Sequence, residues 1–245
     1  MGEPLEFVKT GIGGLDAMLF GGIPKENQVI LSGGPGAGKT LLAFEFLYRN
    51  AKEGNPGIFF TFEEDPKKII HNAKSAFGNF DDIDELIAEG KLVINGRDMT
   101  EGIMDKFDDA SYEFGRIITD IERQIVAKKA TRAVLDSSSA LELLIKDPMV
   151  YRKSMWSLVA NFRRLGVTTI LTSELQSPDR SKLVFKPEHF IFDGMMVMYL
   201  SGEEAKRVSA LEIVKMRGYK HSFTTAPYEI TPDGFNVLSV ENIGD

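Results

Sequence analysis

Residues 33–40 read Gly33-Gly34-Pro35-Gly36-Ala37-Gly38-Lys39-Thr40, which fits the phosphate-loop pattern G-x-x-x-x-G-K-[ST]. The apolar run at 28–32 precedes this stretch and is expected to form a buried strand. The run at 41–47 follows it and favours a helix. A strand, a glycine loop and a helix in this order allow backbone N–H groups to surround an anion at a helix N-terminus. The stretch therefore predicts a phosphate site, with an ordinary glycine-rich turn as the alternative.

A phosphate site of this kind also needs groups that hold a metal ion. Lys39 is expected to reach the β- and γ-phosphates of ATP, and the Thr40 hydroxyl is expected to bind Mg²⁺. Asp136 ends an apolar run at 132–136, which is the position of an acidic metal partner in such proteins. The alternative for Asp136 is a solvated aspartate at the end of a strand.

Two adjacent acids are candidates for the chemical step. Glu63 and Glu64 follow the apolar run at 58–62, at the carboxyl end of a predicted strand, where α/β sheets hold ligands. Because alternation along a strand sends neighbouring side chains in different directions, one of them is expected to act on water. We favour Glu63 as the base, with Glu64 supporting the metal or the water. The alternative is that both acids simply begin a loop.

Two basic residues near the C-terminus could stabilise charge on the γ-phosphate. Lys215 and Arg217 lie two residues apart at the end of a predicted strand, so they should project from one face. Ser209, Leu211 and Ile213 are expected to precede them on that same face. Cations of this kind can act from a neighbouring subunit, and the alternative is an exposed edge strand.

The composition excludes several classes of protein. The 245 residues include no cysteine, which rules out disulfides, thiolate zinc sites and cysteine nucleophiles. The net charge of −7 argues against coating nucleic acid through a bulk positive field. No apolar run approaches the roughly 18 residues that span a membrane, and the start of the chain does not resemble a secretory signal. We therefore expect a cytoplasmic protein without a membrane partner.

The order of elements predicts the fold class. Strands and helices alternate up to about residue 173, and hairpin strands follow; we find no linker or internal repeat, so we expect one domain over residues 1–245. The pattern predicts an α/β fold with a mostly parallel sheet, flanking helices and C-terminal antiparallel hairpins. Residues 1–27 are expected to be a lead-in with turns. The predicted strands are at 28–32, 58–62, 91–94, 132–136, 167–173, 195–200, 207–216, 228–230 and 235–240, with hairpin turns at 201–202 and 232–234. The predicted helices are at about 41–53, 66–77, 82–89, 109–128 and 148–165.

The chain resembles a single-domain KaiC-like ATPase of the RecA/RadA superfamily, over nearly its whole length. Together, the matching stretches are far more specific than the phosphate loop alone. They are residues 11–16 with 21–24, 33–40, 44–48, 56–66, 72–75, 135–137, 172–174 and 215–221.

The resemblance implies a RecA-like P-loop NTPase core that assembles into a homo-hexameric ring, with ATP between subunits. It implies that Glu63 and Glu64 are the catalytic glutamates and that Ser75 lies beside the nucleotide. Contacts to phosphates and magnesium would come from Gly36, Ala37, Gly38, Lys39, Thr40 and Leu41. Contacts to the ATP of the neighbouring subunit would come from Lys215, Met216, Arg217 and His221.

The clock proteins of this family contain two such domains and carry adjacent Ser and Thr autophosphorylation sites before an aspartate-led strand. The corresponding segment here reads Glu188-His189-Phe190-Ile191-Phe192-Asp193 and contains no hydroxyl. We therefore expect an ATPase without autokinase activity.

Three functions follow as hypotheses. The favoured one is Mg-dependent ATP hydrolysis at the subunit interfaces of a ring, coupled to an unknown regulatory or signalling partner. The second is an ATP-dependent DNA-binding recombination accessory, in which a loop at 174–187 with Arg180, Lys182 and Lys186 faces a central channel. The third is a nucleotide-sensing scaffold with little turnover. The lone Trp156 is expected in the core or at an interface.

Overall fold

A computed structural model describes residues 5–96, 110–175, 180, 183–201 and 208–238. Several predicted positions lie outside these ranges: the helix start at residue 109, the turn residue 202, the strand end at 239–240 and Lys182. Over the described residues, the main element is a nine-stranded sheet with the order β11-β10-β9-β8-β3-β7-β6-β4-β5. Its strands are β3 (Gln28–Gly33), β4 (Gly57–Thr61), β5 (Leu92–Gly96), β6 (Arg132–Asp136), β7 (Thr168–Glu174), β8 (Gly194–Ser201), β9 (Val208–Met216), β10 (Ala226–Thr231) and β11 (Gly234–Val237).

The six strands from β8 to β5 in this order are parallel, and β9, β10 and β11 extend the sheet in antiparallel fashion. The predicted α/β class with C-terminal antiparallel strands is therefore confirmed. Every residue of β3 and β4 is buried, as expected for parallel strands covered on both faces.

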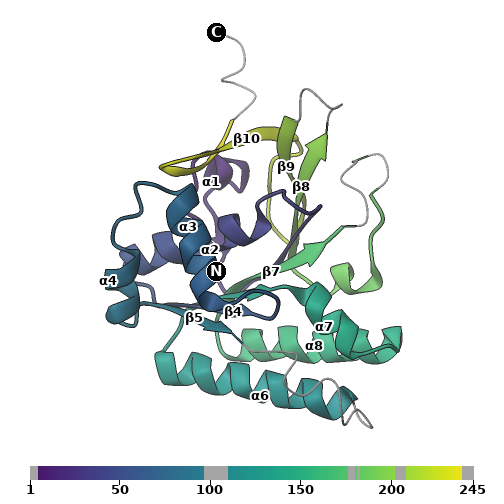
Figure 1. Cartoon of the computed structure of the whole chain (residues 1–245). Coiled ribbons are helices and arrows are strands. Elements are labelled where there is room, and N and C mark those ends of the chain that lie inside the picture. Colours follow the sequence, from purple (N-terminus) through teal and green to yellow (C-terminus); the bar gives the residue numbers. More distant parts are fainter. Residues whose placement is uncertain (1–4, 97–109, 176–179, 181–182, 202–207, 239–245) are drawn as a thin grey trace.

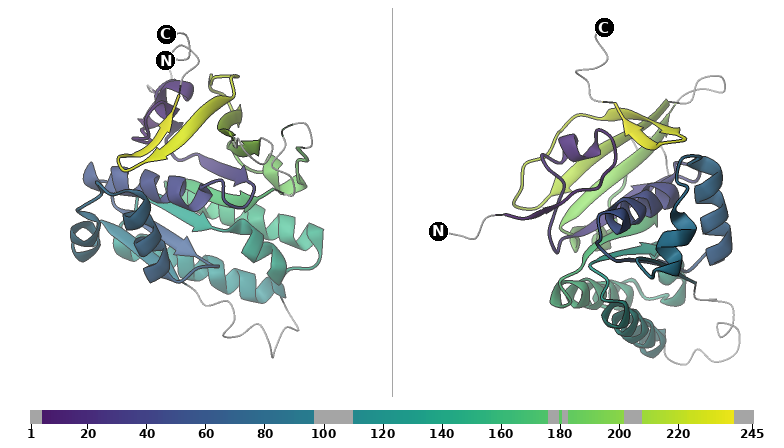
Figure 2. Two further views of the ribbon diagram at one scale, coloured as in Figure 1. Left: turned by 45° about the horizontal axis from the view of Figure 1, so that its top comes forward. Right: turned by 90° about the vertical axis from the view of Figure 1, so that its left-hand side faces the viewer.

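Helices cover the two faces of the sheet (Figures 1 and 2). On one face, α2 (Lys39–Lys52), α3 (Pro66–Ala76) and α4 (Ile83–Ala88) enclose a core that includes Phe44 and Phe59. On the other, α6 (Ala110–Lys128), α7 (Ser138–Leu144) and α8 (Pro148–Arg164) enclose a second core that includes Phe114 and Phe162. None of the helices in the described part of the chain has the length and apolar character needed to cross a bilayer.

Two helices begin where the sequence predicts. The Asp65 carboxylate accepts a hydrogen bond from the Lys67 N–H at 2.7 Å, with Pro66 in the first helical position of α3. Asp147 caps α8 in the same way, accepting from the N–H groups of Met149 and Val150 at 2.8 and 3.1 Å.

The lead-in is more structured than its sequence indicated. It contains β1 (Phe7–Val8), α1 (Leu15–Met18) and β2 (Ile23–Pro24), and β1 pairs with β2 in a separate two-stranded sheet. It packs against β11, since the Val237 N–H donates to the Gly13 carbonyl at 2.8 Å. Gly14 has a φ of +76°, and a Cβ there would lie 1.8 Å from the Val237 carbonyl oxygen, so this contact requires glycine.

One predicted face in β9 is wrong. Met195 pairs with Lys215 but Met196 pairs with Ile213, so Val214 is an extra residue that forms a β-bulge. Because the bulge reverses the alternation, Leu211 and Ile213 lie in the core under α2, whereas Lys215 lies on the face of α8. The two cations share a face as predicted, but it is opposite to the face of Ser209, Leu211 and Ile213.

Candidate nucleotide-binding site

The predicted phosphate loop connects the end of β3 to the first turn of α2. Gly36 and Gly38 have φ values of +78° and +88°, which lets the backbone turn sharply before Lys39 begins the helix. A Cβ on Gly33 would lie 2.8 Å from the Met198 carbonyl oxygen of β8. Of the remaining loop residues, Gly34 and Pro35 precede Gly36, Ala37 lies between the two glycines, and Leu41 follows in the helix. The helix N-terminus directed at this loop provides a partial positive charge for an anion.

The Lys39 side chain reaches back over the phosphate loop to the residues where the loop begins. Its Nζ donates to the carbonyl oxygens of Gly33 and Gly34 at 3.0 and 3.1 Å. Burial lowers the pKa of Lys39, and the nearby carboxylates of Glu174, Asp136 and Glu63 oppose that shift. Its hydrogen bonds go to neutral carbonyls, so a bound phosphate would offer this cation a stronger, charged partner.

Thr40 and Asp136, the predicted metal pair, are in contact. The Thr40 Oγ1 donates to Asp136 Oδ2 at 2.8 Å, and the Thr172 hydroxyl donates to Asp136 Oδ1. Asp136 is only 5% exposed, and this burial raises the pKa of its carboxyl group against the two hydroxyl hydrogen bonds. The arrangement follows from the sheet order, because β6 and β7 are neighbours and both end at the edge where the loop begins.

Glu63 lies beside this pair, directly after β4. Its carboxylate accepts a hydrogen bond from the Ser137 hydroxyl, and Ser137 is the N-cap of α7. The Glu63 charge also raises the pKa of Asp136, which places the two carboxylates within electrostatic reach. Glu64 points elsewhere and forms an ion pair with Lys68 at 3.1 Å. The two acids diverge, as the strand alternation indicated.

Thr172, Ser137 and Glu174 take part in this cluster, although the sequence predicted no site role for them and indicated only a helix start for Ser137. Glu174 is the residue of β7 opposite Gly33, and its carboxylate is the strongest charged influence on Lys39. A signal for these residues was present, since residues 172–174 are polar and end an apolar run. The same pattern, a polar residue at the end of an apolar strand, singled out Asp136 at the end of residues 132–135.

Lys215 and Arg217 lie near the edge of the sheet where the parallel strands begin, whereas the loop lies at the edge where they end. Lys215 pairs with Met195, which pairs with Ile30, about 10 Å along β3 before the loop begins at Gly33. The Lys215 Nζ donates to the carbonyls of His189 and Phe192 at 3.1 and 2.8 Å. Arg217 donates to the carbonyl of Phe190, so both cations bind the short helix η2 (Pro187–Phe190) and its end.

The other predicted nucleotide contacts lie on other elements of the fold. Ser75 is exposed on the last turn of α3, and the Met216 side chain is 5% exposed and packs in the core. His221 is half-buried, with its ring centroid 4.9 Å from that of Phe223. Within one chain, therefore, the structure brings together the loop, Asp136 and Glu63, and it holds Lys215 and Arg217 at η2 instead.

Two of the three cations of the predicted DNA loop, Arg180 and Lys186, lie in the described ranges and form ion pairs. Arg180 donates to both carboxylate oxygens of Glu212, at 2.8 and 2.7 Å, and Lys186 pairs with Glu142. These pairs neutralise the charge that a nucleic-acid backbone would need.

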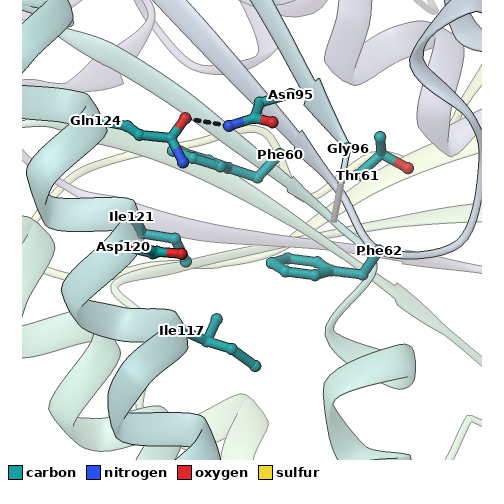
Figure 3. Close-up of a pocket in the computed structure, with 9 residues that line it drawn as sticks. All are labelled: Phe60, Thr61, Phe62, Asn95, Gly96, Ile117, Asp120, Ile121 and Gln124. Atoms are coloured by element: carbon teal, nitrogen blue, oxygen red, sulfur yellow. Dashed lines mark hydrogen bonds between the residues drawn. The ribbon is translucent and has the colours of Figure 1, made fainter. Parts of the chain in front are cut away.

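A separate cavity of about 140 Å³ lies between the ends of β4 and β5 and helix α6 (Figure 3). Phe60, Phe62 and Ile117 line it, and a hydrogen bond between Asn95 and Gln124 crosses its edge. Nucleotide-sized ligands occupy roughly 300–1,000 Å³. This cavity is too small for a nucleotide.

A family model described as "ATPase: KaiC" matches residues 8–242, almost the whole described chain. The chain belongs to the KaiC ATPase family. It is thus an ATPase with the P-loop fold that its resemblance implied, and the loop, Asp136 and Glu63 lie in the matched region. The predicted family membership and ATPase activity are confirmed.

Relatives of two lengths share this KaiC-type domain. A UPF0273 protein of Methanopyrus kandleri is 34% identical over 239 residues, covering 95% of this chain and 92% of that protein. A UPF0273 protein of Aeropyrum pernix is 35% identical over 236 residues, with 94% and 92% covered. The circadian clock oscillator protein KaiC of Picosynechococcus is 35% identical over 241 residues, but the chain spans only 44% of its length. The chain therefore corresponds to less than half of the clock protein and to nearly all of the UPF0273 proteins.

Proposed function

We propose that this KaiC-type ATPase binds ATP with Mg²⁺ at residues 33–41 and hydrolyses it with Glu63 as the base. The observation that carries this proposal is the convergence of three groups: Thr40 in contact with Asp136, and Glu63 held beside them by Ser137. The hydroxyl and carboxylate oxygens of Thr40 and Asp136 are the donor type that Mg²⁺ prefers. Among the described residues, no cluster of three or more acidic, His or Cys side chains could hold a metal alone. The Thr40–Asp136 pair instead suits an ion that is shared with phosphates and water.

In this proposal each side chain has a separate task. The loop N–H groups and Lys39 bind the β- and γ-phosphates, and Mg²⁺, when bound, supplies charge neutralisation on their oxygens. Glu63 orients a water molecule in line with the γ-phosphate and accepts its proton, which gives ADP and phosphate. Glu64 supports the metal or its water at longer range.

We further propose that the active form is a homo-hexameric ring in which Lys215 and Arg217 stabilise the γ-phosphate charge of the neighbouring subunit. The positions of these two cations support this ring, because they lie where the parallel strands begin and their own loop lies where the strands end. Met216 and His221 would accompany them, and Ser75 would lie beside the nucleotide. Turnover would switch the ring between conformations that a partner reads. The single domain over 1–245 and a cytoplasmic location remain predictions.

The experiment that tests the catalytic role is Glu63→Gln. This variant should retain binding of ATP while its turnover falls about 100-fold or more, because only the proton acceptor is lost. Exposed Glu53, which follows α2, provides a matched control, and Glu53→Gln should hydrolyse ATP like the wild type. Normal turnover in Glu63→Gln would remove Glu63 from the mechanism.

Light scattering of the purified protein tests the ring. In Mg-ATP we expect a mass near six times 27.2 kDa. A monomer both with and without Mg-ATP would contradict the interfacial role of Lys215 and Arg217. Salt-sensitive, ATP-dependent binding to single-stranded DNA would instead support the recombination accessory, which the ion-paired Arg180 and Lys186 disfavour.

A further inference from the structure

The C-terminal hairpin formed by β10 and β11 lies against the phosphate loop. Tyr228 of β10 donates its hydroxyl hydrogen to the Ala37 carbonyl oxygen at 2.6 Å. The two residues are 6% and 1% exposed, so water cannot replace this bond. They lie 191 positions apart in the sequence, and the bond joins the end of the sheet to the middle of the loop.

The Tyr228 bond fixes the orientation of one particular peptide group. The Ala37 carbonyl and the Gly38 N–H belong to the same planar trans peptide, so they point in opposite directions. Holding the carbonyl toward β10 therefore holds the Gly38 N–H away from β10. A phosphate loop binds its anion with N–H groups of this kind, immediately before the helix N-terminus.

The same hairpin restricts Gly38 from a second side. A Cβ on Gly38 would lie 3.0 Å from Phe235 Cζ and 3.3 Å from Ile230 Cδ1, so both side chains pack closely over the loop. Phe235 is in turn fixed to α2, because its N–H donates at 2.7 Å to Glu45, whose side chain is fully buried. The hairpin and the helix that begins at the loop thus form one connected support.

We infer that Tyr228 is a positioning residue for nucleotide binding, which holds the Ala37–Gly38 peptide so that its N–H is ready to meet a phosphate oxygen. Its hydroxyl contacts the loop backbone on the side of the hairpin and acts on the ligand through that backbone. The inference rests on the proposal that this loop holds the phosphates. If so, phosphate binding by the loop depends on β10, a strand near the C-terminus.

The test is Tyr228→Phe, which removes the hydroxyl and keeps the ring that fills the core. A single neutral hydrogen bond corresponds to an affinity change of about 2- to 12-fold. We expect the dissociation constants of ADP and of pyrophosphate to rise by that factor, together with KM for ATP, while kcat changes by less than about twofold. Pyrophosphate isolates the phosphate contacts, since it has no base or sugar.

Tyr199→Phe is the matched control, because the Tyr199 hydroxyl donates to Glu212 at 2.9 Å in the same sheet without contacting the loop. Both variants should lose thermal stability, and only Tyr228→Phe should lose affinity for pyrophosphate. Unchanged affinity in Tyr228→Phe, or an equal loss in Tyr199→Phe, would overturn the inference. If the wild-type protein itself fails to bind pyrophosphate and ADP, the proposed phosphate site is what fails.

Discussion

His189 is a buried residue whose ionisation opposes folding. It is 2% exposed on η2, and its Nδ1 accepts a hydrogen bond from the Lys186 N–H at 3.3 Å. Burial, together with the nearby cations of Lys186 and Lys215, lowers its pKa from 6.5 to about 4, and the Glu142 carboxylate opposes the shift. The His189 carbonyl also accepts a hydrogen bond from Lys215. Protonation of the His189 ring would therefore affect η2, the segment that binds Lys215 and Arg217.

The lowered pKa of His189 predicts a loss of stability in acid. Between about pH 6.5 and pH 4 the unfolded chain binds a proton that the folded chain excludes, so the free energy of unfolding falls as the pH falls. From pH 7 to pH 5 this group should cost about 2 kcal/mol. In His189→Asn, which keeps a hydrogen-bond acceptor but cannot titrate there, the loss should be smaller by that amount in urea unfolding. Equal losses in both proteins would contradict the assignment.

At the residue scale, sequence reasoning found the charged groups of the site better than their partners. Asp136 and Glu63 stand out in the sequence because an acid that ends an apolar strand is typical of the edge where α/β sheets hold ligands. Thr172 and Ser137 also lie at the ends of apolar runs, but nothing in the sequence shows which acid each of them holds. Their roles depend on which strands are neighbours in the sheet, and sequence spacing does not reveal that order.

Among the elements, the C-terminal hairpin has a strict packing requirement. Gly234 in its turn has a φ of +115°, and a Cβ there would lie 2.1 Å from the Glu45 Oε1. Glu45 is fully buried, pairs with Arg49 at 2.9 Å and binds the hairpin backbone. A side chain at 234 would therefore displace the buried Glu45 carboxylate from Arg49 as well as strain the turn.

Gly234→Ala should lower the free energy of unfolding by about 3 kcal/mol, the usual cost of leaving a buried charge such as the Glu45 carboxylate without its partner. Gly54→Ala is the control, because Gly54 also has a positive φ of +81° but has no atom within 4 Å of its added Cβ. The control should lose only about 1–2 kcal/mol, the backbone cost alone. Urea unfolding of both variants measures the difference, and equal losses would show that the hairpin tolerates a side chain there.

The elements that sequence reasoning missed are the short or irregular ones. Helices α3 and α8 are predictable because an aspartate cap followed by proline marks each start. The structure of the lead-in was missed because two-residue strands and a four-residue helix are too short to show a period. The face of Lys215 relative to Ile213 was wrong because strict alternation fails at a bulge, and a bulge leaves no clear mark in the sequence.

At the scale of the whole molecule, one surface groove contains both Arg217 and Trp156. Met149, Arg152, Lys153 and Phe190 also line it. Trp156, on α8, is 63% exposed, so the predicted alternative of a core position is wrong and that of an interface stays open. Three large apolar side chains of this groove, those of Met149, Trp156 and Phe190, are each more than half exposed, which is typical of a contact surface.

If Arg217 acts on a neighbouring nucleotide, the same neighbour should cover Trp156. This residue is the only tryptophan of the chain, so its emission reports on that single place. We expect the emission to move to shorter wavelength when Mg-ATP is added, and Lys39→Ala, which weakens phosphate binding, should reduce the change. Emission typical of an exposed indole in Mg-ATP, at a mass near six subunits, would place the interface elsewhere.

The central claim is that each active site combines Glu63 of one subunit with Arg217 of the next, and mixing two inactive variants tests it most directly. Glu63→Gln lacks the base and Arg217→Ala lacks the cation, so each alone should hydrolyse ATP at least 100-fold more slowly than the wild type. In an equal mixture with free subunit exchange, about a quarter of the head-to-tail interfaces regain both groups. We expect turnover near one quarter of the wild-type rate, and none when Glu63→Gln is mixed with the double variant. A mixture as inactive as its parents, with subunit exchange confirmed, would contradict a site shared between subunits.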